Sequence, residues 1–469
     1  MIHARHFMLD QFAPIAVYSK LKEYFNEEIT FLFESAGSSE GNYSFVIVGA
    51  RERLVYNNST TFYTNAQGET KQHDLSPFAF LKEYYSNIDT AYYRHQVKAL
   101  GVGYVDGFIG FIGYDMVRVF EPVLESFMNS LDDTMNTPDM DLILPKLIVA
   151  YSHKDHNITL IGHTHSMRAE FDNIETLLKS HYSYTPLQPL TGDDEGLFSF
   201  SKEKFFEMVR QSKEKIRSGD VFQILMTNRF TRHVTVDPFS FYRVLRTKNP
   251  SPYMFLMEYE DFSIVGSSPE VMVRLSDGEL LLRPIAGTRR RGNTKQRDQE
   301  LEEELLADPK ELAEHLMLID LGRNDVGRVA KTGTVTVKDM MHIERYSHVM
   351  HIVSDVEATL ADNKDMFDLF AATFTAGTMT GAPKIRAMEL IAEFEGLKRG
   401  FYSGAVGYFG FDGNMDSAIT IRTALVMPDR VILQAGAGIV ADSVDEMEYL
   451  EVHNKLGALM SSLDDLKRP

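Results

Sequence analysis

Cysteine and tryptophan are both missing from the chain, although it is 469 residues long. Without cysteine there can be no disulfide bond, thiolate metal site, iron–sulfur cluster or cysteine nucleophile. The lack of cysteine also suits a reducing compartment, so we expect a cytoplasmic protein. The lack of tryptophan is mildly unusual for this length, and it excludes no class of protein.

Long hydrophobic runs are lacking too. The longest uncharged run, residues 369–383, is too short and too rich in threonine and glycine to cross a bilayer. At the N-terminus, charged residues appear before any apolar stretch of the kind that a secretory signal needs. The sequence therefore predicts no membrane span, no signal peptide and no membrane partner.

Positive charge is scarce: 48 lysine and arginine residues stand against 67 acidic ones, which gives a net charge of −19. Such a balance argues against a nucleic-acid partner. Nucleotide-binding motifs are missing as well, since no Gly-Lys-Ser/Thr occurs and residues 107–115 (GFIGFIGYD) lack the GxGxxG spacing. The glycines of residues 107–115 instead predict strands in tight contact or a bulged hairpin.

The remaining composition, 44% hydrophobic and 25% charged, is that of an ordinary globular protein. A mass of 53.3 kDa allows two or three domains, or one large domain with an appendage. Residues 182–198 hold two prolines, two glycines and an acidic cluster, so we interpret them as a linker. They separate a predicted first unit, residues 1–185, from a second, residues 200–465.

Both units mix strand-like apolar segments with amphipathic helices. Strands are predicted at residues 26–35, 44–48, 142–151, 158–162, 221–226, 262–265, 271–275, 279–282 and 334–337, and helices at 201–217, 295–307, 310–321, 384–394 and 444–459. Their irregular order, without an internal repeat, indicates an α+β or mixed α/β fold rather than a regular doubly wound one.

Two pairs of glutamates are the most informative polar residues. Glu448 and Glu451 are three positions apart on one predicted helix, and Glu311 and Glu314 repeat this spacing on another. A stripe of acids on a helix is usually a solvated face, and a glutamate in a first turn complements the helix dipole. If the pairs converge, however, four carboxylates in one cleft require a cation or raised pKa values. Oxygen ligands favour a hard ion, and Mg²⁺ is preferred over Ca²⁺ if an anionic substrate shares it.

Other polar residues allow two interpretations each. His348 and His351 flank two apolar residues, and either could be a general acid or base, although such a histidine is more often a satisfied core residue. Arg422 lies in a predicted apolar strand and must pair with an internal carboxylate or with that of a ligand. Residues 375–386 are rich in small residues and lead into a helix, which favours an anionic ligand. Residues 289–291 (RRR) are predicted to be a solvated basic loop.

Several longer motifs follow one another through the second unit. They are residues 219–223 (GDVFQ), 268–270 (SPE), 283–289 (RPIAGTR), 311–318 (ELAEHLML), 323–325 (RND), 348–351 (HVMH), 376–384 (AGTMTGAPK), 435–440 (AGAGIV), 448–451 (EYLE) and 454–455 (NK). This series resembles that of the chorismate-utilising enzymes, and most closely the large subunits (component I) of anthranilate synthases. The resemblance implies β-sheets covered by helices, with an N-terminal regulatory unit at 1–185 and a chorismate-binding catalytic unit at 200–465.

The resemblance also implies roles for the glutamates and for one histidine. Glu314 and Glu451 would be the Mg²⁺ ligands, and Glu311 and Glu448 would have supporting catalytic roles. The ion would hold the ring carboxylate of chorismate. His351 would assist the departure of the enolpyruvyl group.

The remaining implied site residues surround the substrate. Thr378 would face the ring of chorismate. The other implied substrate-binding residues are Tyr402, Arg422, Gly436, Ala437, Gly438 and Lys455, which would hold the enolpyruvyl carboxylate, together with Gly287 and Thr288.

Gln223 and Ala286 bear on the choice of nucleophile. Where this chain has Gln223, isochorismate and salicylate synthases use a lysine to activate water, and a glutamine cannot act as that base. The resemblance therefore implies ammonia as the nucleophile, with Gln223 at the catalytic centre. Aminodeoxychorismate synthase large subunits typically carry a lysine where this chain has Ala286. An alanine there favours anthranilate as the product, with aminodeoxychorismate synthase as the alternative.

The resemblance extends to feedback inhibition and to a partner. Residues 31–35 (FLFES) and 249–255 (NPSPYMF) resemble the segments that bind L-tryptophan in this family. The implied tryptophan-binding residues are Glu34, Ser35, Pro252, Tyr253, Met254 and Phe255, with Met254 and Phe255 covering the indole. Since no cysteine is present to form a glutamyl thioester, ammonia would come from solution or from a glutamine amidotransferase (component II). The expected assembly is a heterotetramer of two large and two small subunits.

Overall fold

The structure is a computed structural model, and it describes residues 2–35, 43–346 and 349–467. The strands are β1 (His3–Met8), β2 (Thr30–Glu34), β3 (Tyr43–Asn57), β4 (Thr60–Thr64), β5 (Thr70–His73), β6 (Gly107–Ile112), β7 (Met140–Ser152), β8 (Asn157–Gly162), β9 (Leu197–Phe198), β10 (Gln223–Arg232), β11 (Tyr253–Glu258), β12 (Ser263–Ser268), β13 (Val271–Ser276), β14 (Glu279–Leu282), β15 (Ile285–Arg290), β16 (Thr336–Arg345), β17 (Val349–Thr359), β18 (Gly381–Ala382), β19 (Ala405–Gly410), β20 (Met415–Ile419), β21 (Thr423–Met427) and β22 (Arg430–Ile439). The helices are α1 (Pro14–Phe25), α2 (Pro77–Ser86), α3 (Thr90–Leu100), α4 (Val117–Phe120), α5 (Glu125–Met128), α6 (His165–Ala169), α7 (Phe171–Lys179), α8 (Lys202–Arg217), α9 (Pro238–Lys248), α10 (Lys295–Ala307), α11 (Pro309–Gly327), α12 (Met366–Thr373), α13 (Lys384–Glu395) and α14 (Asp445–Asp465), with 3₁₀ turns η1 (Tyr114–Met116), η2 (Pro122–Leu124) and η3 (Gly377–Met379).

The strands of the described residues form one connected antiparallel network. Strand β7 lies at its centre, because it pairs with β3, β6 and β8. From β3 the ladder continues through β2, β11, β12, β21 and β22 to β10. From β6 it continues through β19, β20, β13 and β14 to β17, which also pairs with β15 and β16. Among the described residues, two strand ladders therefore join the first 185 residues to the rest of the chain, β2–β11 and β6–β19, and an isolated bridge links Asp132 to Leu397.

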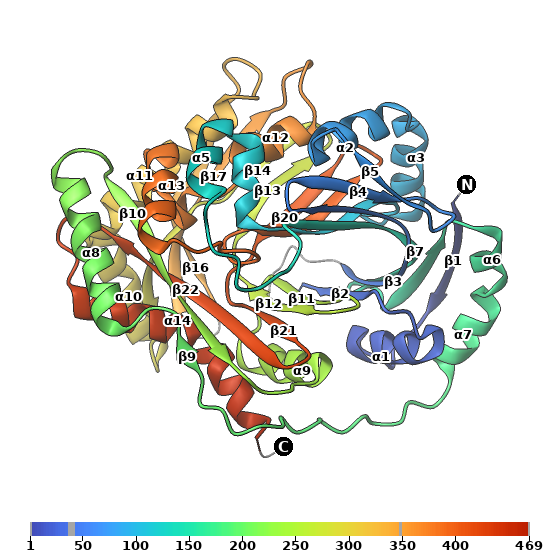
Figure 1. Cartoon of the computed structure of the whole chain (residues 1–469). Coiled ribbons are helices and arrows are strands. Elements are labelled where there is room, and N and C mark those ends of the chain that lie inside the picture. Colours follow the sequence, from blue (N-terminus) through green and yellow to red (C-terminus); the bar gives the residue numbers. More distant parts are fainter. Residues whose placement is uncertain (1, 36–42, 347–348, 468–469) are drawn as a thin grey trace.

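Two large apolar cores lie on opposite faces of β11. Phe255 and Met257 belong to the first core, together with side chains of β6, β13 and β19. Leu256, between them, belongs to the second core, which lies under helices α8, α9, α13 and α14. This alternation follows from the two-residue period of a strand. Figure 1 shows α8, α9 and α14 gathered on one side of the β10–β22 ladder.

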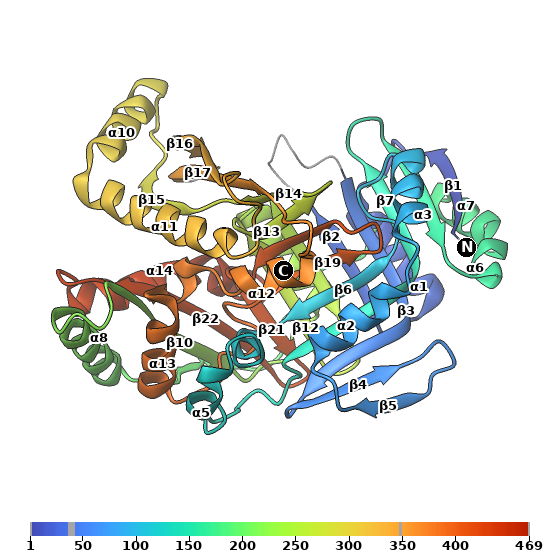
Figure 2. The same ribbon diagram turned by 90° about the horizontal axis from the view of Figure 1, so that it is seen from above.

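A third, smaller layer carries part of the candidate site. Strands β15, β16 and β17 pack against helices α10 and α11 around Leu305, Met350 and Ile352. Figure 2 shows this layer projecting at one end of the molecule, above α14. Helix α11 begins where the sequence predicts, because Asp308 caps the amides of Lys310 and Glu311 and Pro309 occupies the first helical position.

The glycine-rich residues 107–115 form one strand and a 3₁₀ turn, not a hairpin. Strand β6 lies between β7 and β19 in close contact with both. A methyl group on Gly107 would lie 2.0 Å from the carbonyl oxygen of Phe409, and one on Gly110 would lie 2.1 Å from that of Asp141. The predicted tight strand contact is confirmed, and the repeated glycines exist because neighbouring backbones come this close.

The predicted linker runs along the outside of the molecule. Figure 1 shows this stretch as an extended trace from α7 to β9. Apart from β9, this stretch pairs with a strand-like neighbour through the bridge between Thr191 and Thr235.

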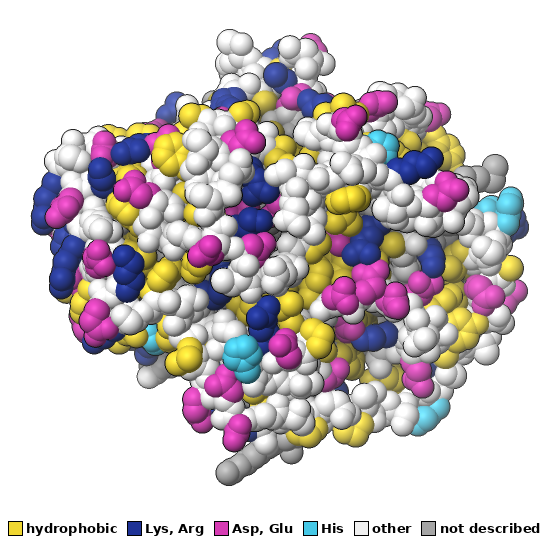
Figure 3. All heavy atoms as spheres, viewed as in Figure 1, with side chains coloured by type: hydrophobic (Ala, Val, Ile, Leu, Met, Phe, Trp, Pro, Cys, Tyr) yellow, Lys and Arg dark blue, Asp and Glu magenta, His cyan; other side chains and the backbone are white. Residues whose placement is uncertain are grey.

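The surface carries charges of both signs. On the face in Figure 3, basic and acidic side chains are intermingled. Among the described residues, no helix combines the length and apolar character that crossing a membrane requires.

Candidate active site

The two glutamate pairs, far apart in the sequence, come together between helices α11 and α14. The pKa of Glu314 is raised by burial and by the carboxylates of Glu311 and Glu451. Burial also raises the pKa of Glu448, and the Glu451 carboxylate adds to the effect. Glu448 is only 9% exposed, so it does not lie on a solvated face. Four carboxylates therefore share one region, which is the second of the two possibilities that the sequence left open.

Lys455 lies among these carboxylates and connects them to the glycine-containing strand β22. Its Nζ is 2.7 Å from Glu451 and donates a hydrogen bond of 2.9 Å to the carbonyl oxygen of Gly436. It also lies close enough to lower the pKa values of Glu314 and Glu448 by its positive charge, against the larger effect of burial. The charge of Lys310 lowers the same two pKa values, and Arg289 pairs with Glu311. Three cations still leave the four carboxylates with an excess of negative charge.

The carboxylates fit a divalent ion that a substrate helps to bind. Among the described residues, no three histidine, aspartate or glutamate side chains converge as a complete metal site. Mg²⁺ needs fewer, because it is commonly held by one or two carboxylates together with anionic groups of a substrate. Glu314 and Glu451, one from each helix, suit that arrangement, since Glu451 contributes to the raised pKa of Glu314.

The arginines of residues 289–291 do not form a solvated loop, and that prediction was wrong. Arg289 lies near the end of β15, and Arg291 is the first residue after this strand. Arg289 forms ion pairs with Glu304, Asp308 and Glu311, and Arg291 with Asp298. These contacts fix β15 against α10 and α11, and they place Arg289 beside one of the four site glutamates.

His351 lies on β17, and its hydrogen-bond partners determine which ring nitrogen carries the proton. Its Nδ1 is 3.0 Å from the carbonyl oxygen of Gly287 and 3.0 Å from Oγ1 of Thr288. Because a carbonyl can only accept, Nδ1 carries the proton and Nε2 is left as an acceptor. Burial lowers the pKa of His351, so the ring is mainly neutral at pH 7. His348, the other candidate, lies outside the described residues.

Gly287 connects this histidine to the glutamates. Its φ of +65° lies in the region that favours glycine, and a Cβ there would meet an oxygen of Glu311 at 3.2 Å. The pairing of β15 with β17 shifts register between Ala286 and Thr288. This irregularity sets the carbonyl of Gly287 against His351 and its α-carbon against Glu311.

Arg422 was predicted within a strand, and this was wrong: it lies in the turn between β20 and β21, with φ of +50°. Its guanidinium has no ion-pair partner among the described residues, although burial lowers its pKa. Its charge reaches His351 and the hydroxyl of Tyr402. A half-buried cation without a carboxylate partner is suited to an anionic ligand.

The glycine strand β22 provides a backbone surface beside Arg422. Gly436 and Gly438 share one face of β22, whereas the side chain of Ala437 belongs to the core under the helices. Only the backbone of Ala437 can therefore contact a ligand in the site.

Gln223 lies against this strand. A methyl group on Gly438 would lie 2.7 Å from Nε2 of Gln223. Among the described residues, the buried Oε1 of Gln223 has no hydrogen-bond partner.

Glu270 is a buried acid that no role was predicted for, although its motif (SPE) was recognised. It lies between β12 and β13, and it accepts a hydrogen bond of 2.9 Å from the hydroxyl of Thr378. Burial raises the pKa of Glu270 to about 7, while Thr378 and Lys455 lower it. The sequence could have indicated a role for Glu270, because a single carboxylate between two apolar strands is unusual. At neutral pH this group is poised to give up a proton.

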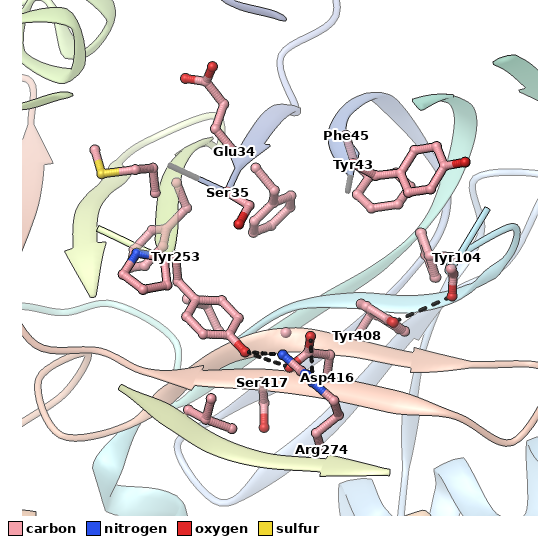
Figure 4. Close-up of a pocket in the computed structure, with 18 of the residues that line it drawn as sticks. Glu34, Ser35, Tyr43, Phe45, Tyr104, Tyr253, Arg274, Tyr408, Asp416 and Ser417 are labelled. Atoms are coloured by element: carbon pink, nitrogen blue, oxygen red, sulfur yellow. Dashed lines mark hydrogen bonds and ion pairs between the residues drawn. The ribbon is translucent and has the colours of Figure 1, made fainter. Parts of the chain in front are cut away.

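A separate cavity of about 860 Å³ is lined by all six residues predicted to bind tryptophan, which are Glu34, Ser35, Pro252, Tyr253, Met254 and Phe255. The pairing of β2 with β11 brings the two segments together. Figure 4 shows Tyr253 above Asp416 and Arg274 at one wall of this cavity. Its other walls come from β3, β6, β19 and the end of β16.

Two of these six side chains point away from the cavity. The carboxylate of Glu34 is bound by Tyr242 and Arg246 of α9, and the side chain of Met254 belongs to the core on that same side. Phe255 faces the opposite core, because successive strand residues alternate. The prediction that Met254 and Phe255 together cover one ligand ring is therefore wrong. Met254 contributes backbone.

Comparisons with known proteins agree with this arrangement. Residues 28–461 match the chorismate binding enzyme family. The chain is 43% identical to anthranilate synthase component 1 of Acinetobacter calcoaceticus, over 98% of this chain and 94% of that protein. It is 40% identical to the protein of that name from Aquifex aeolicus, over 97% and 93%. The crystal structure of anthranilate synthase component I from Streptococcus pneumoniae is 34% identical and superimposes with a TM-score of 0.77, covering 90% of this chain and 93% of that one. The chain belongs to the chorismate-binding enzyme family.

Proposed function

We propose that this protein is the large component of an anthranilate synthase, and that it converts chorismate and ammonia into anthranilate, pyruvate and water. Arg422 carries this proposal, because it is a partly buried cation without an ion-pair partner among the described residues. Its charge reaches the Tyr402 hydroxyl, which bonds to the backbone of Gly436. Lys455 connects the same glycine to Glu451, one of the four carboxylates. Chorismate is a dianion, so one carboxylate could meet Arg422 and the other a metal ion. The relatives named above support the same reaction.

The substrate would be bound at both ends. Arg422, the hydroxyl of Tyr402 and the backbone amides near Gly436 would hold the enolpyruvyl carboxylate. Glu314 and Glu451 would hold Mg²⁺ at the ring carboxylate. When bound there, Mg²⁺ would supply positive charge that polarises the ring carboxylate and makes the ring more susceptible to nucleophilic attack.

Three side chains would then serve the chemistry. Gln223, whose Oε1 lacks a partner among the described residues, would accept a hydrogen bond from ammonia as its nitrogen attacks C2. Protonated Glu270 would give its proton to the 4-hydroxyl, which leaves as water. The proton that the attacking nitrogen must lose would return to the Glu270 carboxylate. Neutral His351 would then take the C2 proton through Nε2 while the bond between C3 and the enolpyruvyl oxygen breaks. That proton would pass to the methylene carbon of the departing group, which leaves as pyruvate.

Incubation with chorismate, Mg²⁺ and ammonium at alkaline pH should yield anthranilate and pyruvate in equal amounts. Anthranilate is fluorescent, so its formation can be followed directly and the pyruvate measured with a coupled dehydrogenase. The alternative, an aminodeoxychorismate synthase, predicts a product that keeps the enolpyruvyl group and no early pyruvate. Ala286, which lies in β15, offers no amine for a covalent intermediate and so favours anthranilate. A preparation that forms neither product would contradict both readings.

We further propose that ammonia reaches the site from a glutamine amidotransferase subunit. The relatives carry the name component 1, which presupposes a second component. The chain has no cysteine with which to hydrolyse glutamine by a thioester route. The proposed assembly contains two copies of each subunit.

L-Tryptophan is the proposed inhibitor, and the 860 Å³ cavity is its proposed site. Replacing Ser35 with leucine should raise the tryptophan concentration for half-inhibition by about tenfold or more, because a hydroxyl is lost and the added bulk enters the cavity. Activity without tryptophan should stay close to that of the wild type. Inhibition curves with anthranilate fluorescence as readout test this, with exposed Ser218→Leu as the control. An unchanged curve for Ser35→Leu would count against the site.

A further inference from the structure

Tyr346 contacts both the large cavity and the candidate base, His351. It lines the large cavity, at the end of β16. Its ring is also packed against the ring of His351, with the centroids 5.5 Å apart and the planes at 66°. No other described residue that lines the cavity forms an aromatic contact with His351. One side chain, that of Tyr346, thus contacts both the cavity and the candidate base.

The hydroxyl end of Tyr346 is fixed by a carboxylate of the same cavity wall. It donates a hydrogen bond of 2.9 Å to Glu344, which also lies 3.3 Å from a guanidinium nitrogen of Arg283. Glu344 stands opposite His351 in the β16–β17 ladder. Arg283 is in turn paired with Asp355, further along β17. A change in the position of Tyr346 would therefore be passed to His351 through ring contact and through the strand that carries it.

The backbone of Tyr346 is anchored, so its side chain is the part that can respond. Its amide donates to the carbonyl oxygen of Val349 at 2.8 Å, and its own carbonyl accepts from Arg291 at 2.7 Å. The charge of Glu270, the candidate proton donor, also reaches the Tyr346 hydroxyl. Both candidate proton-transfer groups thus lie near this one ring.

We propose that Tyr346 is a positioning residue that couples the cavity to His351, so that a ligand in the cavity slows catalysis by displacing the Tyr346 ring. This inference rests on the proposed function, and it deepens the proposed regulation. A ligand can shift His351 only as far as it binds the two ring positions with different affinity. The same coupling must act in reverse, so that substrate in the active site weakens binding in the cavity.

The test compares Tyr346→Leu and Tyr346→Phe with the wild type. Tryptophan binding is measured by calorimetry with and without chorismate analogue, and inhibition by anthranilate formation. In the wild type we expect the two ligands to weaken each other's binding by about 5- to 150-fold, the usual range for such coupling. In Tyr346→Leu this factor should fall toward one while tryptophan still binds. Tyr346→Phe keeps the ring but loses the bond to Glu344, and it should give an intermediate factor.

Tyr43→Leu is the matched control. Tyr43 also lines the cavity, but its hydroxyl bonds to Gly101, and among the described residues its ring makes no aromatic contact with His351. This change should weaken tryptophan binding and leave the coupling factor of the wild type. A folded Tyr346→Leu with the full wild-type factor would overturn the inference, and so would a wild type that makes anthranilate without binding tryptophan. If Tyr346→Leu does not fold, a wild-type coupling factor in Tyr346→Phe would overturn the inference instead. Failure of the proposed function is seen separately, as absence of anthranilate without tryptophan.

Discussion

Replacing Glu451 with glutamine should lower chorismate turnover at saturating ammonia by about 100-fold or more, because one proposed Mg²⁺ ligand is lost and charge stabilisation by a metal is worth several kcal/mol. The same change frees Lys455 from its 2.7 Å ion pair. Raising the Mg²⁺ concentration should recover part of the activity, since the remaining ligand, Glu314, still binds the ion weakly. Initial rates across a Mg²⁺ titration measure both effects.

Glu446→Gln is the control for this change, because Glu446 lies on the same helix and pairs with Lys202 on the surface. It should keep wild-type activity. Thermal unfolding should show that both variants are folded, since the Glu451 side chain is 45% exposed and an exposed ion pair contributes little to stability. Wild-type Mg²⁺ dependence in Glu451→Gln would refute the assignment of this residue.

Replacing Glu270 with glutamine should lower kcat by about 10²- to 10⁴-fold, the usual contribution of a proton donor. In the wild type, kcat/KM for chorismate should fall as the pH rises through about 7, because the pKa of Glu270 is about 7 and only its protonated form can donate. In Glu270→Gln this fall should disappear. The rates have to be compared at constant free ammonia, since the ammonium pool also changes with pH.

The same variant should be more stable than the wild type at pH 8. Burial raises the pKa of Glu270 from 4.5 to about 7, so the folded protein holds this proton more tightly than the unfolded chain does. The stability that this group contributes is fully present below pH 4.5 and is lost as the pH rises through 7. At pH 8 the buried carboxylate costs up to about 3 kcal/mol, which glutamine would remove.

Urea unfolding at pH 5 and pH 8 measures this difference, in the absence of substrate and metal. The gain in Glu270→Gln should be larger at pH 8 than at pH 5. Glu279→Gln serves as the control, because Glu279 lies exposed on the neighbouring β14. Equal stability of Glu270→Gln and the wild type at both pH values, together with full activity, would exclude Glu270 as the buried acid.

Much of the architecture follows from local sequence. Helix α8 begins one residue inside the predicted range and ends where predicted, and α10 matches its range, because polar caps and helical spacing mark both ends. The two glutamate pairs were identified from a three-residue spacing alone. That the two glutamate pairs come together depends on β15, against which α11 packs, and on β22, against which α14 packs. No local signal in the sequence encodes this arrangement.

The errors arise from local backbone geometry in one case and from contacts between distant segments in the others. Arg422 looked like a strand residue because its neighbours are apolar, yet a positive φ turns the chain at this position. Arg289 looked solvated because its acidic partners lie 15 to 22 residues further along the chain. Met254 could be placed on the correct face only once β11 was paired with both β2 and β12. Sequence patterns predict elements well and the partners of charged side chains poorly.

The two ladders that tie β2 to β11 and β6 to β19 limit how this protein can evolve. The first 185 residues cannot be exchanged as an independent module, since each ladder requires matching partners on both sides of the junction. A recombinant that joined unrelated halves would leave two strand edges without their partners. Change in the proposed tryptophan cavity and change in the proposed catalytic unit are therefore expected to be inherited together, through compensating substitutions along these four strands.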